Sequence, residues 1–217
     1  MAKLKLAVLI SGRGSNLQSL IDACQAPDYP AEIVHVISNV GGVMGLRRAE
    51  QAGIATTVID HKTFATRQAF EDALSGTLDQ SGAELICLAG FMRLLTAAFV
   101  SRWHDRMINI HPSLLPAFKG LDVQQRAIDA GVRFSGCTVH FVRPDMDCGP
   151  IIAQAAVPIN GDDDASSLAA RILEQEHKIY PLAVKLIAEN RISIINERVM
   201  VKNSSSTETS IINPGVE

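Results

Sequence analysis

The chain has 217 residues, of which 47% are hydrophobic and 20% are charged, and its formal net charge is −3. This length and balance predict one globular domain that can bury a sizeable core. A slightly acidic chain lacks the basic excess with which general nucleic-acid and membrane-surface binders neutralise phosphates, so neither partner is expected, and any anionic ligand must be held by local groups.

The sequence also indicates where the protein works. No apolar run approaches the roughly 20 residues that span a bilayer, and the N-terminal segment lacks the features of a signal peptide. The four cysteines are widely spaced and form no C-x-x-C pair, so reduced thiols are expected rather than disulfides or a metal site. A cytoplasmic location is therefore expected.

In the first half, apolar runs rich in Val, Ile and Leu alternate with segments of helical period. Continuous apolar strands are typical of sheets covered by helices on both faces. The pattern predicts an α/β fold with an open, doubly wound, mostly parallel sheet. The expected strands are 4–10, 33–37, 54–59, 85–89 and 107–110, and the expected helical segments are 16–24, 43–52 and 66–78.

Beyond residue 133 the pattern changes. The runs FSGCTVHFV and PIIAQAAVPI, joined by the turn-prone RPDMDCG, predict a hairpin added to the sheet. The acidic segment 162–164 supplies capping groups for a long helix that Pro181 is expected to kink. The later ISII run is expected to add an edge strand. We therefore predict a single domain over residues 1–200 and a flexible, Ser/Thr-rich tail over 201–217.

The first strand is followed by SGRGSN, in which Gly14, Ser15 and Asn16 open a helical segment. Free backbone N–H groups at a helix N-terminus bind anions. Leu17 replaces the third glycine of a dinucleotide motif, and no P-loop ending follows, so a single phosphate is the better ligand. The alternative is a tight turn in which Ser15 or Asn16 caps the helix.

Asn109 and His111 end the fifth expected strand, and prolines at 112 and 116 stiffen the segment that follows. Being two residues apart, they point the same way, and the carboxyl end of a parallel strand faces the ligand crevice. An amide donor beside an imidazole suits a reaction that builds negative charge on a carbonyl oxygen. A hydrogen-bonded structural role for His111 is the alternative.

Charged residues occur at four further places. Asp147 precedes a tight Cys-Gly-Pro bend that could aim its carboxylate at an imidazole and favour the charged imidazole, or it could cap the turn. Glu176 falls on the apolar stripe of the long helix, where it requires an arginine partner or ligand hydroxyls. Arg93 follows the fourth strand near the same crevice, whereas Arg67 is by default an exposed helix residue.

Several of these segments together resemble the phosphoribosylglycinamide (GAR) formyltransferases, a folate-dependent family of purine synthesis within the wider formyltransferase group. The match covers nearly all of residues 6 to 190. INIHPSLLP with a downstream D-x-G-P is typical of the whole group, whereas SGRGSN with EQEHKIYP indicates the GAR branch. The blocks VLISGRGSNLQSLIDA, LAGFMRLL, FKGL, TVHFV and MDCGPII complete the resemblance.

The resemblance implies a Rossmann-like formyltransferase fold that carries the formyl group of 10-formyltetrahydrofolate, a co-substrate, to the amine of GAR without a metal, as a monomer or homodimer. Residues 1–100 would form the phosphate-binding half and 101–200 the catalytic and folate half. By matching position, the catalytic residues would be Asn109, His111 and Asp147. Gly14, Ser15 and Asn16 would bind the GAR phosphate, and Glu176 the ribose hydroxyls. The folate would contact Arg67, Met92, Arg93, Leu94, Leu95, Asn109 and Arg143.

Two departures from the family pattern matter. Residues 122–125 lack the Thr and His that often follow the FKG segment, so no role is assigned there. Cys148 stands where many members have glycine, and a positive φ at that position would add strain on the order of 1 kcal/mol.

Four other functions are weighed. The methionyl-tRNA formyltransferases and formyltetrahydrofolate hydrolases of the group carry extra domains for which this chain is not expected to have room. Formyl transfer to another small amine, such as a nucleotide sugar, is the nearest enzymatic alternative, and SGRGSN with Glu176 argues against it. A mononucleotide-binding sensor would keep the phosphate loop but would not need Asn109, His111 and Asp147.

Overall fold

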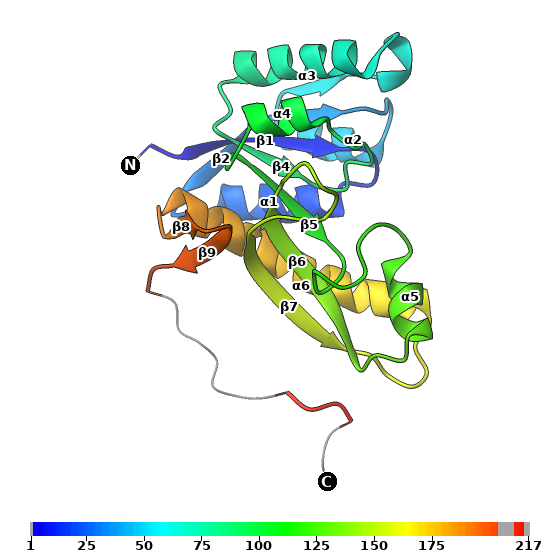
Figure 1. Cartoon of the computed structure of the whole chain (residues 1–217). Helices are drawn as coiled ribbons and strands as arrows, with labels where there is room; N and C mark the ends of the chain where they lie inside the picture. The colour runs from blue at the N-terminus through cyan, green and yellow to red at the C-terminus, as the bar shows by residue number, and fades with distance from the viewer. Residues whose placement is uncertain (1, 204–210, 215–217) are drawn as a thin grey trace.

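The computed structural model describes residues 2–203 and 211–214 and contains one central seven-stranded sheet (Figure 1). The strand order is β3-β2-β1-β4-β5-β6-β7. The first five strands are parallel, whereas β6 pairs antiparallel with both β5 and β7. The strands are β1 (Leu4–Ile10), β2 (Ala31–Ser38), β3 (Thr56–Val58), β4 (Leu85–Leu88), β5 (Met107–His111), β6 (Phe134–Phe141) and β7 (Ile151–Pro158).

Helices cover both faces of the sheet, as the continuous apolar strands predict. Alternate residues of β1 enter different cores: Val8 packs with α1, α2 and α6, whereas Leu9 packs with α3 and α4. Figure 1 shows α3 and α4 on one side of the sheet and α1 and α6 on the other. The helices are α1 (Ser15–Gln25), α2 (Met44–Gln51), the short 3₁₀ helix η1 (His61–Thr63), α3 (Arg67–Ser81), α4 (Ala97–Arg102), α5 (Val123–Asp129) and α6 (Ala165–Ala188).

The predicted doubly wound sheet, hairpin and long helix are confirmed. Asp164 is the N-cap of α6, where its side chain accepts from the Ser167 amide and completes a capping box. Pro181 lies inside α6 without ending it. The short helices α4 and α5 follow Thr96 and Asp122 and were not predicted from the sequence.

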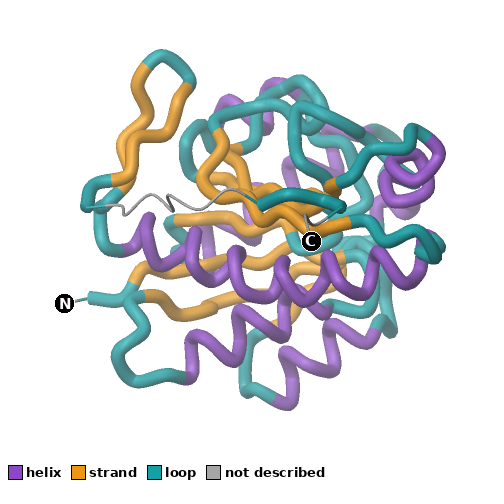
Figure 2. Tube along the Cα trace, turned by 90° about the horizontal axis from the view of Figure 1, so that it is seen from below, coloured by secondary structure: helices purple, strands orange, loops and turns teal. Residues whose placement is uncertain are grey.

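The prediction that ISII forms an edge strand of the main sheet is wrong: the segment forms a strand, but it does not pair with that sheet. Residues Ile192–Ile195 form β8, which pairs antiparallel with β9 (Arg198–Val201) in a separate two-stranded sheet. Figure 2 shows this hairpin beside the main sheet, beyond the end of α6.

The predicted flexible tail over 201–217 lies largely outside the described residues. Within the described part, Val201 belongs to β9, and the Asn213 side chain donates to the carbonyl oxygens of Arg133 and Ile159 at 2.6 and 3.1 Å.

Candidate functional site

Strand order reverses direction between β1 and β4, so the loops that follow these strands diverge and open a crevice at their carboxyl ends. Two hollows occupy it. A pocket of about 270 Å³ is lined by residues 11–16 and by Ala89, Gly90 and Met92. A larger cavity of about 480 Å³ lies beside it, and Gly90 and Met92 line both hollows. The cavity is bounded mainly by segments 90–95, 109–112, 120–124 and 142–148.

The small pocket has the features of an anion site. Gly14 is the N-cap of α1, with φ of 67°, and no side chain caps this helix. The alternative reading, a helix capped by Ser15 or Asn16, is therefore wrong, and the first-turn amides are left for a ligand. A Cβ on Gly14 would lie 2.7 Å from the Cα of Gly45, so glycine is required where α2 approaches the loop.

Asn16 and Glu176 join the anion pocket to the long helix. The Asn16 amide nitrogen donates to a Glu176 carboxylate oxygen at 2.6 Å, and both side chains are buried. The Asn16 side-chain oxygen is also buried, without a hydrogen-bond partner among the described residues. Glu176 therefore pairs with a neutral amide rather than with the arginine that a structural role predicted. A buried pair with an unused acceptor suits hydroxyl groups of a ligand.

Substitution of Glu176 by glutamine tests the electrostatic state of this pair. Burial raises the pKa of the Glu176 carboxyl. The hydrogen bond from Asn16 lowers this pKa, but by less than burial raises it. The folded state therefore holds this proton more tightly than the unfolded chain does. The contribution of Glu176 to the free energy of unfolding thus falls as pH rises above the ordinary carboxyl pKa of 4.5.

Glu176→Gln keeps an acceptor for Asn16 and has no charge to bury. We expect its melting temperature to exceed that of the wild type by about 1–3 °C at pH 8, and the difference to shrink at pH 5. Differential scanning calorimetry at the two pH values measures this. A variant that melts at a lower temperature than the wild type at pH 8 contradicts the raised pKa of Glu176. A melting-temperature difference that is the same at both pH values contradicts it as well.

Asn109 points toward His140 on the neighbouring strand. The two residues are direct partners in the β5–β6 pairing, and the Asn109 Nδ2 atom lies 3.4 Å from His140 Nε2. His140 Nδ1 donates to the carbonyl oxygen of Phe141 at 2.9 Å, and burial lowers the pKa of His140. A neutral His140 therefore presents Nε2 as an acceptor that orients the amide of Asn109. The second N–H of this amide is left for the cavity.

His111 is held between two acceptors. It is 6% exposed, its Nε2 atom donates to the carbonyl oxygen of Phe118 at 3.0 Å, and its Nδ1 atom lies 3.5 Å from Asp147 Oδ1. A carbonyl on one side and a carboxylate on the other therefore fix the orientation of the imidazole ring. The structure therefore joins the predicted His111 and Asp147, and Nδ1 is the nitrogen on the Asp147 side.

The backbone fixes the Asp147 carboxylate. Its other oxygen accepts from the Gly120 N–H at 2.8 Å, and Asp147 itself has a φ of 49°. Gly149 has a φ of 124°, and a Cβ there would lie 2.1 Å from the carbonyl oxygen of Phe141. The strain anticipated at Cys148 is absent, because Cys148 is not among the described residues with positive φ; Asp147 has a positive φ instead, and Gly149 adopts its own without a Cβ to clash.

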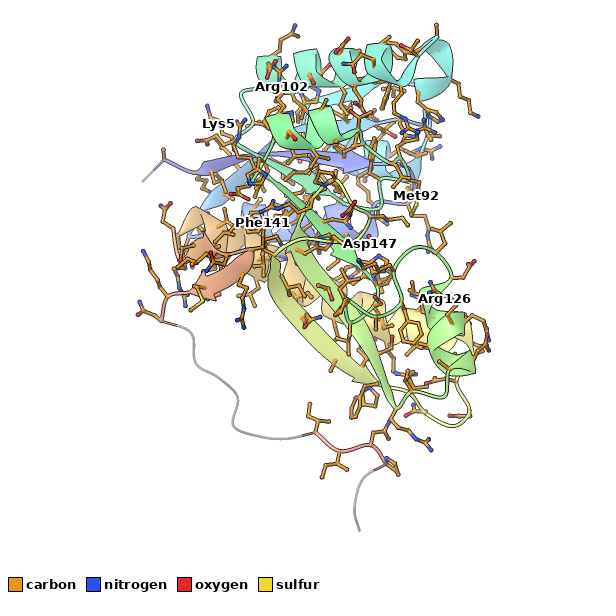
Figure 3. The ribbon with its side chains drawn as sticks, in the orientation of Figure 1. Lys5, Met92, Arg102, Arg126, Phe141 and Asp147 are labelled. Carbon is orange, nitrogen blue, oxygen red and sulfur yellow. The ribbon has the colours of Figure 1, made fainter. Side chains whose placement is uncertain are left out.

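A chain of hydrogen bonds links the two hollows. The Met92 amide donates to the Ser11 hydroxyl at 2.8 Å, and that hydroxyl donates to the side-chain oxygen of Asn39 at 2.5 Å. Ser11 lies in the anion loop, the segment 11–14 after β1 that lines the small pocket, and Met92 lies in the loop after β4 and lines both hollows. The two loops are therefore fixed relative to each other. Met92 and Asp147, on opposite loops of the cavity wall, are labelled in Figure 3.

All but one of the residues predicted to contact folate line the larger cavity. Arg67 begins α3, is exposed, and is not among the residues that line the cavity, so its folate role stays a prediction. Arg143 lines the cavity, but its guanidinium binds two carboxylates, described below. The remaining predicted residues all line the cavity: Met92, Arg93, Leu94, Leu95 and Asn109.

Sequence reasoning missed His140 and the segment 118–120, which contacts His111 and Asp147. Thr138 and His140 are two residues apart on β6, so both face the same side of the sheet, which could have indicated a polar site there. Only the register of β6 against β5 shows that His140 lies opposite Asn109. In the part of the chain that the structure describes, no cluster of three or more His, Cys, Asp or Glu side chains could hold a metal. No helix within residues 2–203 and 211–214 has the length and apolar character to cross a membrane.

The fold and the site define a doubly wound α/β protein whose anion pocket adjoins an apolar cavity at a histidine–carboxylate pair. The family model described as formyl transferase matches residues 4–184. The chain belongs to the formyl transferase family.

Individual relatives narrow the comparison. The chain is similar to the phosphoribosylglycinamide formyltransferase of Haemophilus influenzae, with 47% identity over 88% of this chain and 90% of that protein. It is 50% identical to the trifunctional purine biosynthetic protein adenosine-3 of Gallus gallus over 88% of its own length, but it spans only 19% of that protein. The glycinamide ribonucleotide transformylase 1 of Symbiobacterium toebii superposes with a TM-score of 0.90 and 44% identity, covering 93% of this chain and 95% of that one.

Proposed function

We propose that this protein transfers the formyl group of 10-formyltetrahydrofolate to the primary amine of GAR, giving formylglycinamide ribonucleotide and tetrahydrofolate in de novo purine (IMP) biosynthesis. The observation that carries the proposal is the meeting of an anion pocket and an apolar cavity at Asn109, His111 and Asp147. A phosphorylated amine and a folate could thus approach the same reacting groups from two sides. Relatives that bear this activity in their names support the substrates.

In this proposal the GAR phosphate lies on the backbone amides of Gly14, Ser15 and Asn16, where the α1 dipole favours negative charge. Glu176 accepts hydrogen bonds from the ribose hydroxyls. The folate occupies the larger cavity, against the exposed side chains of Met92 and Leu94. Phosphate, ribose and folate are thereby held by different elements, so the amine and the formyl carbon meet with little freedom.

The chemistry follows from the polar groups at the junction. The GAR amine attacks the formyl carbon, a C–N bond forms, and negative charge develops on the formyl oxygen. The free N–H of Asn109 and the imidazole of His111 stabilise that charge, in the manner of an oxyanion hole. Collapse breaks the bond to the folate nitrogen, which takes up a proton, while the new amide nitrogen loses one. Asp147, whose Oδ1 atom lies 3.5 Å from Nδ1, orients the imidazole throughout.

The proposal assigns residues 1–100 to phosphate binding and 101–200 to catalysis and folate binding, within one domain of residues 1–200. We also propose a cytoplasmic location, supported by four free thiols in the described structure. The partners proposed are the two small molecules, with no nucleic acid or membrane surface, in agreement with a net charge of −3. The working unit is proposed to be a monomer or homodimer.

Isotope tracing tests the acceptor. The protein is incubated with 10-formyltetrahydrofolate carrying ¹³C in the formyl group, with and without GAR, and the products are identified by mass spectrometry. We expect label in formylglycinamide ribonucleotide only when GAR is present, and little labelled formate without it. Rapid release of labelled formate without GAR would identify a hydrolase. Transfer to another amine but not to GAR would identify a different formyltransferase.

A further inference from the structure

Arg143 is bound by carboxylates from two segments far from it in sequence. Its Nε and one Nη donate to the Glu197 carboxylate at 2.7 and 3.2 Å, and the same Nη donates to Asp105 at 2.8 Å. Its remaining nitrogen donates to the carbonyl oxygen of Val142 at 3.2 Å. The side chain is only 11% exposed. Every guanidinium nitrogen thus has a protein acceptor, and four of the five N–H groups are used within the described structure.

The two carboxylates come from turns with defined backbone geometry. Glu197 and Asn196 form the turn of the β8–β9 hairpin with φ values of 58° and 51°, and Asp105, between α4 and β5, has a φ of 56°. The guanidinium of Arg143 holds the pKa of the Glu197 carboxyl below its usual range, so this partner is ionised at neutral pH. Arg143 therefore connects the C-terminal hairpin to the central sheet through charge-assisted hydrogen bonds.

Arg143 begins the loop that forms one wall of the larger cavity. At the start of the loop, the Val142 amide donates to the Met107 carbonyl oxygen at 2.9 Å. At the far end, Asp147 is held by Gly120 and lies beside His111. The stretch 144–146 lines the cavity between these two attachments. Displacement at Arg143 would therefore move the cavity wall, whereas the Asp147 carboxylate keeps its own attachment to Gly120.

We propose that Arg143 is a positioning residue, held by Glu197 and Asp105, that sets the position of the cavity-wall loop 142–149 for folate binding. The C-terminal hairpin thereby contributes to the site without touching the ligand. This inference rests on the proposed function, because it takes folate as the occupant of the cavity. It replaces the direct Arg143–folate contact that the family resemblance implies.

The test uses Glu197→Gln, Asp105→Asn and the double variant, which keep the shape of each side chain. Asp79→Asn is the matched control, because it removes another exposed ion pair, with Arg102, on α3 and α4. Hydrogen–deuterium exchange of the peptide covering 142–149 reports the loop in the free protein. Fluorescence titration with tetrahydrofolate reports binding, and steady-state kinetics separate kcat from KM for each substrate.

In the double variant we expect faster exchange in 142–149, a Kd for tetrahydrofolate raised by about 3- to 10-fold, and kcat within about 2-fold of the wild type. The KM for GAR should not change in the double variant. The Asp79→Asn control should match the wild type in exchange, folate affinity and kinetics. Unaltered exchange, or faster exchange with unchanged folate affinity, would overturn the inference. A wild type that binds tetrahydrofolate but transfers no formyl group would contradict the proposed function. In that case the exchange of 142–149 and the Kd for tetrahydrofolate would still decide whether Arg143 positions the loop. A wild type that binds no tetrahydrofolate would overturn the folate role.

Discussion

Replacement of His111 by alanine is expected to lower kcat for formyl transfer by about 10²- to 10³-fold at neutral pH. The imidazole is buried between the Phe118 carbonyl and the Asp147 carboxylate, so its removal takes away a fixed donor beside the cavity. The change also leaves a buried carbonyl without its partner, which costs about 1–3 kcal/mol of stability. Steady-state kinetics well below the measured melting temperature separate the two effects.

The control for this experiment is His104→Ala. His104 is exposed and its only ion pair in the described structure is with its neighbour Asp105, so its loss should leave kcat near the wild-type value. A His111→Ala protein that is folded and turns over like the wild type would remove His111 from the mechanism. A deficit repaired by raising the GAR or folate concentration would make His111 a binding residue, because saturation cannot restore a group needed in the transition state.

Replacement of Asp147 by asparagine is expected to lower kcat by about 10²-fold or more with little change in structure. Asparagine tolerates the left-handed backbone found here, where φ is 49°, and its side-chain oxygen can still accept from Gly120. The substitution therefore removes the charge while the loop is kept. Without a carboxylate at 3.5 Å, the imidazole of His111 loses its ionisable neighbour.

The measurement for Asp147→Asn is the dependence of kcat on pH. Because Asp147 Oδ1 lies 3.5 Å from His111 Nδ1, we expect kcat of the variant to be lower than that of the wild type at every pH at which both proteins are folded. Asp129→Asn on α5 provides a control at an exposed carboxylate. A variant with the wild-type profile and rate would show that Asp147 only shapes the turn.

Much of the fold was predictable because it follows from local patterns. The continuous apolar strands and the helical periods between them predict a parallel sheet covered on both faces, and the structure has one. The ends of the first and fifth strands, next to Ser11 and His111, were predictable for the same reason. Since carboxyl ends of parallel strands share one edge, the anion loop and the Asn109–His111 pair could be placed in one crevice before any distance was known.

Contacts between loops were not predictable. His111 meets the Phe118 carbonyl and Asp147 meets the Gly120 amide, and such backbone contacts leave no signature in side-chain pattern. The role of His140 depends on its register opposite Asn109. The pairing of Arg143 with Glu197 joins residues 54 positions apart through the β8–β9 hairpin, where the sequence predicted only an edge strand at ISII.

The central claim is that GAR and folate meet at Asn109, His111 and Asp147. A crystal structure of the protein with GAR and a non-reactive 10-formyltetrahydrofolate analogue tests it most directly. We predict the phosphate on the amides of residues 14–16, the folate ring in the cavity lined by 90–95, and the amine and formyl carbon within reach of Asn109 Nδ2 and His111 Nδ1. A phosphate bound elsewhere, or a formyl group distant from His111, would contradict the account.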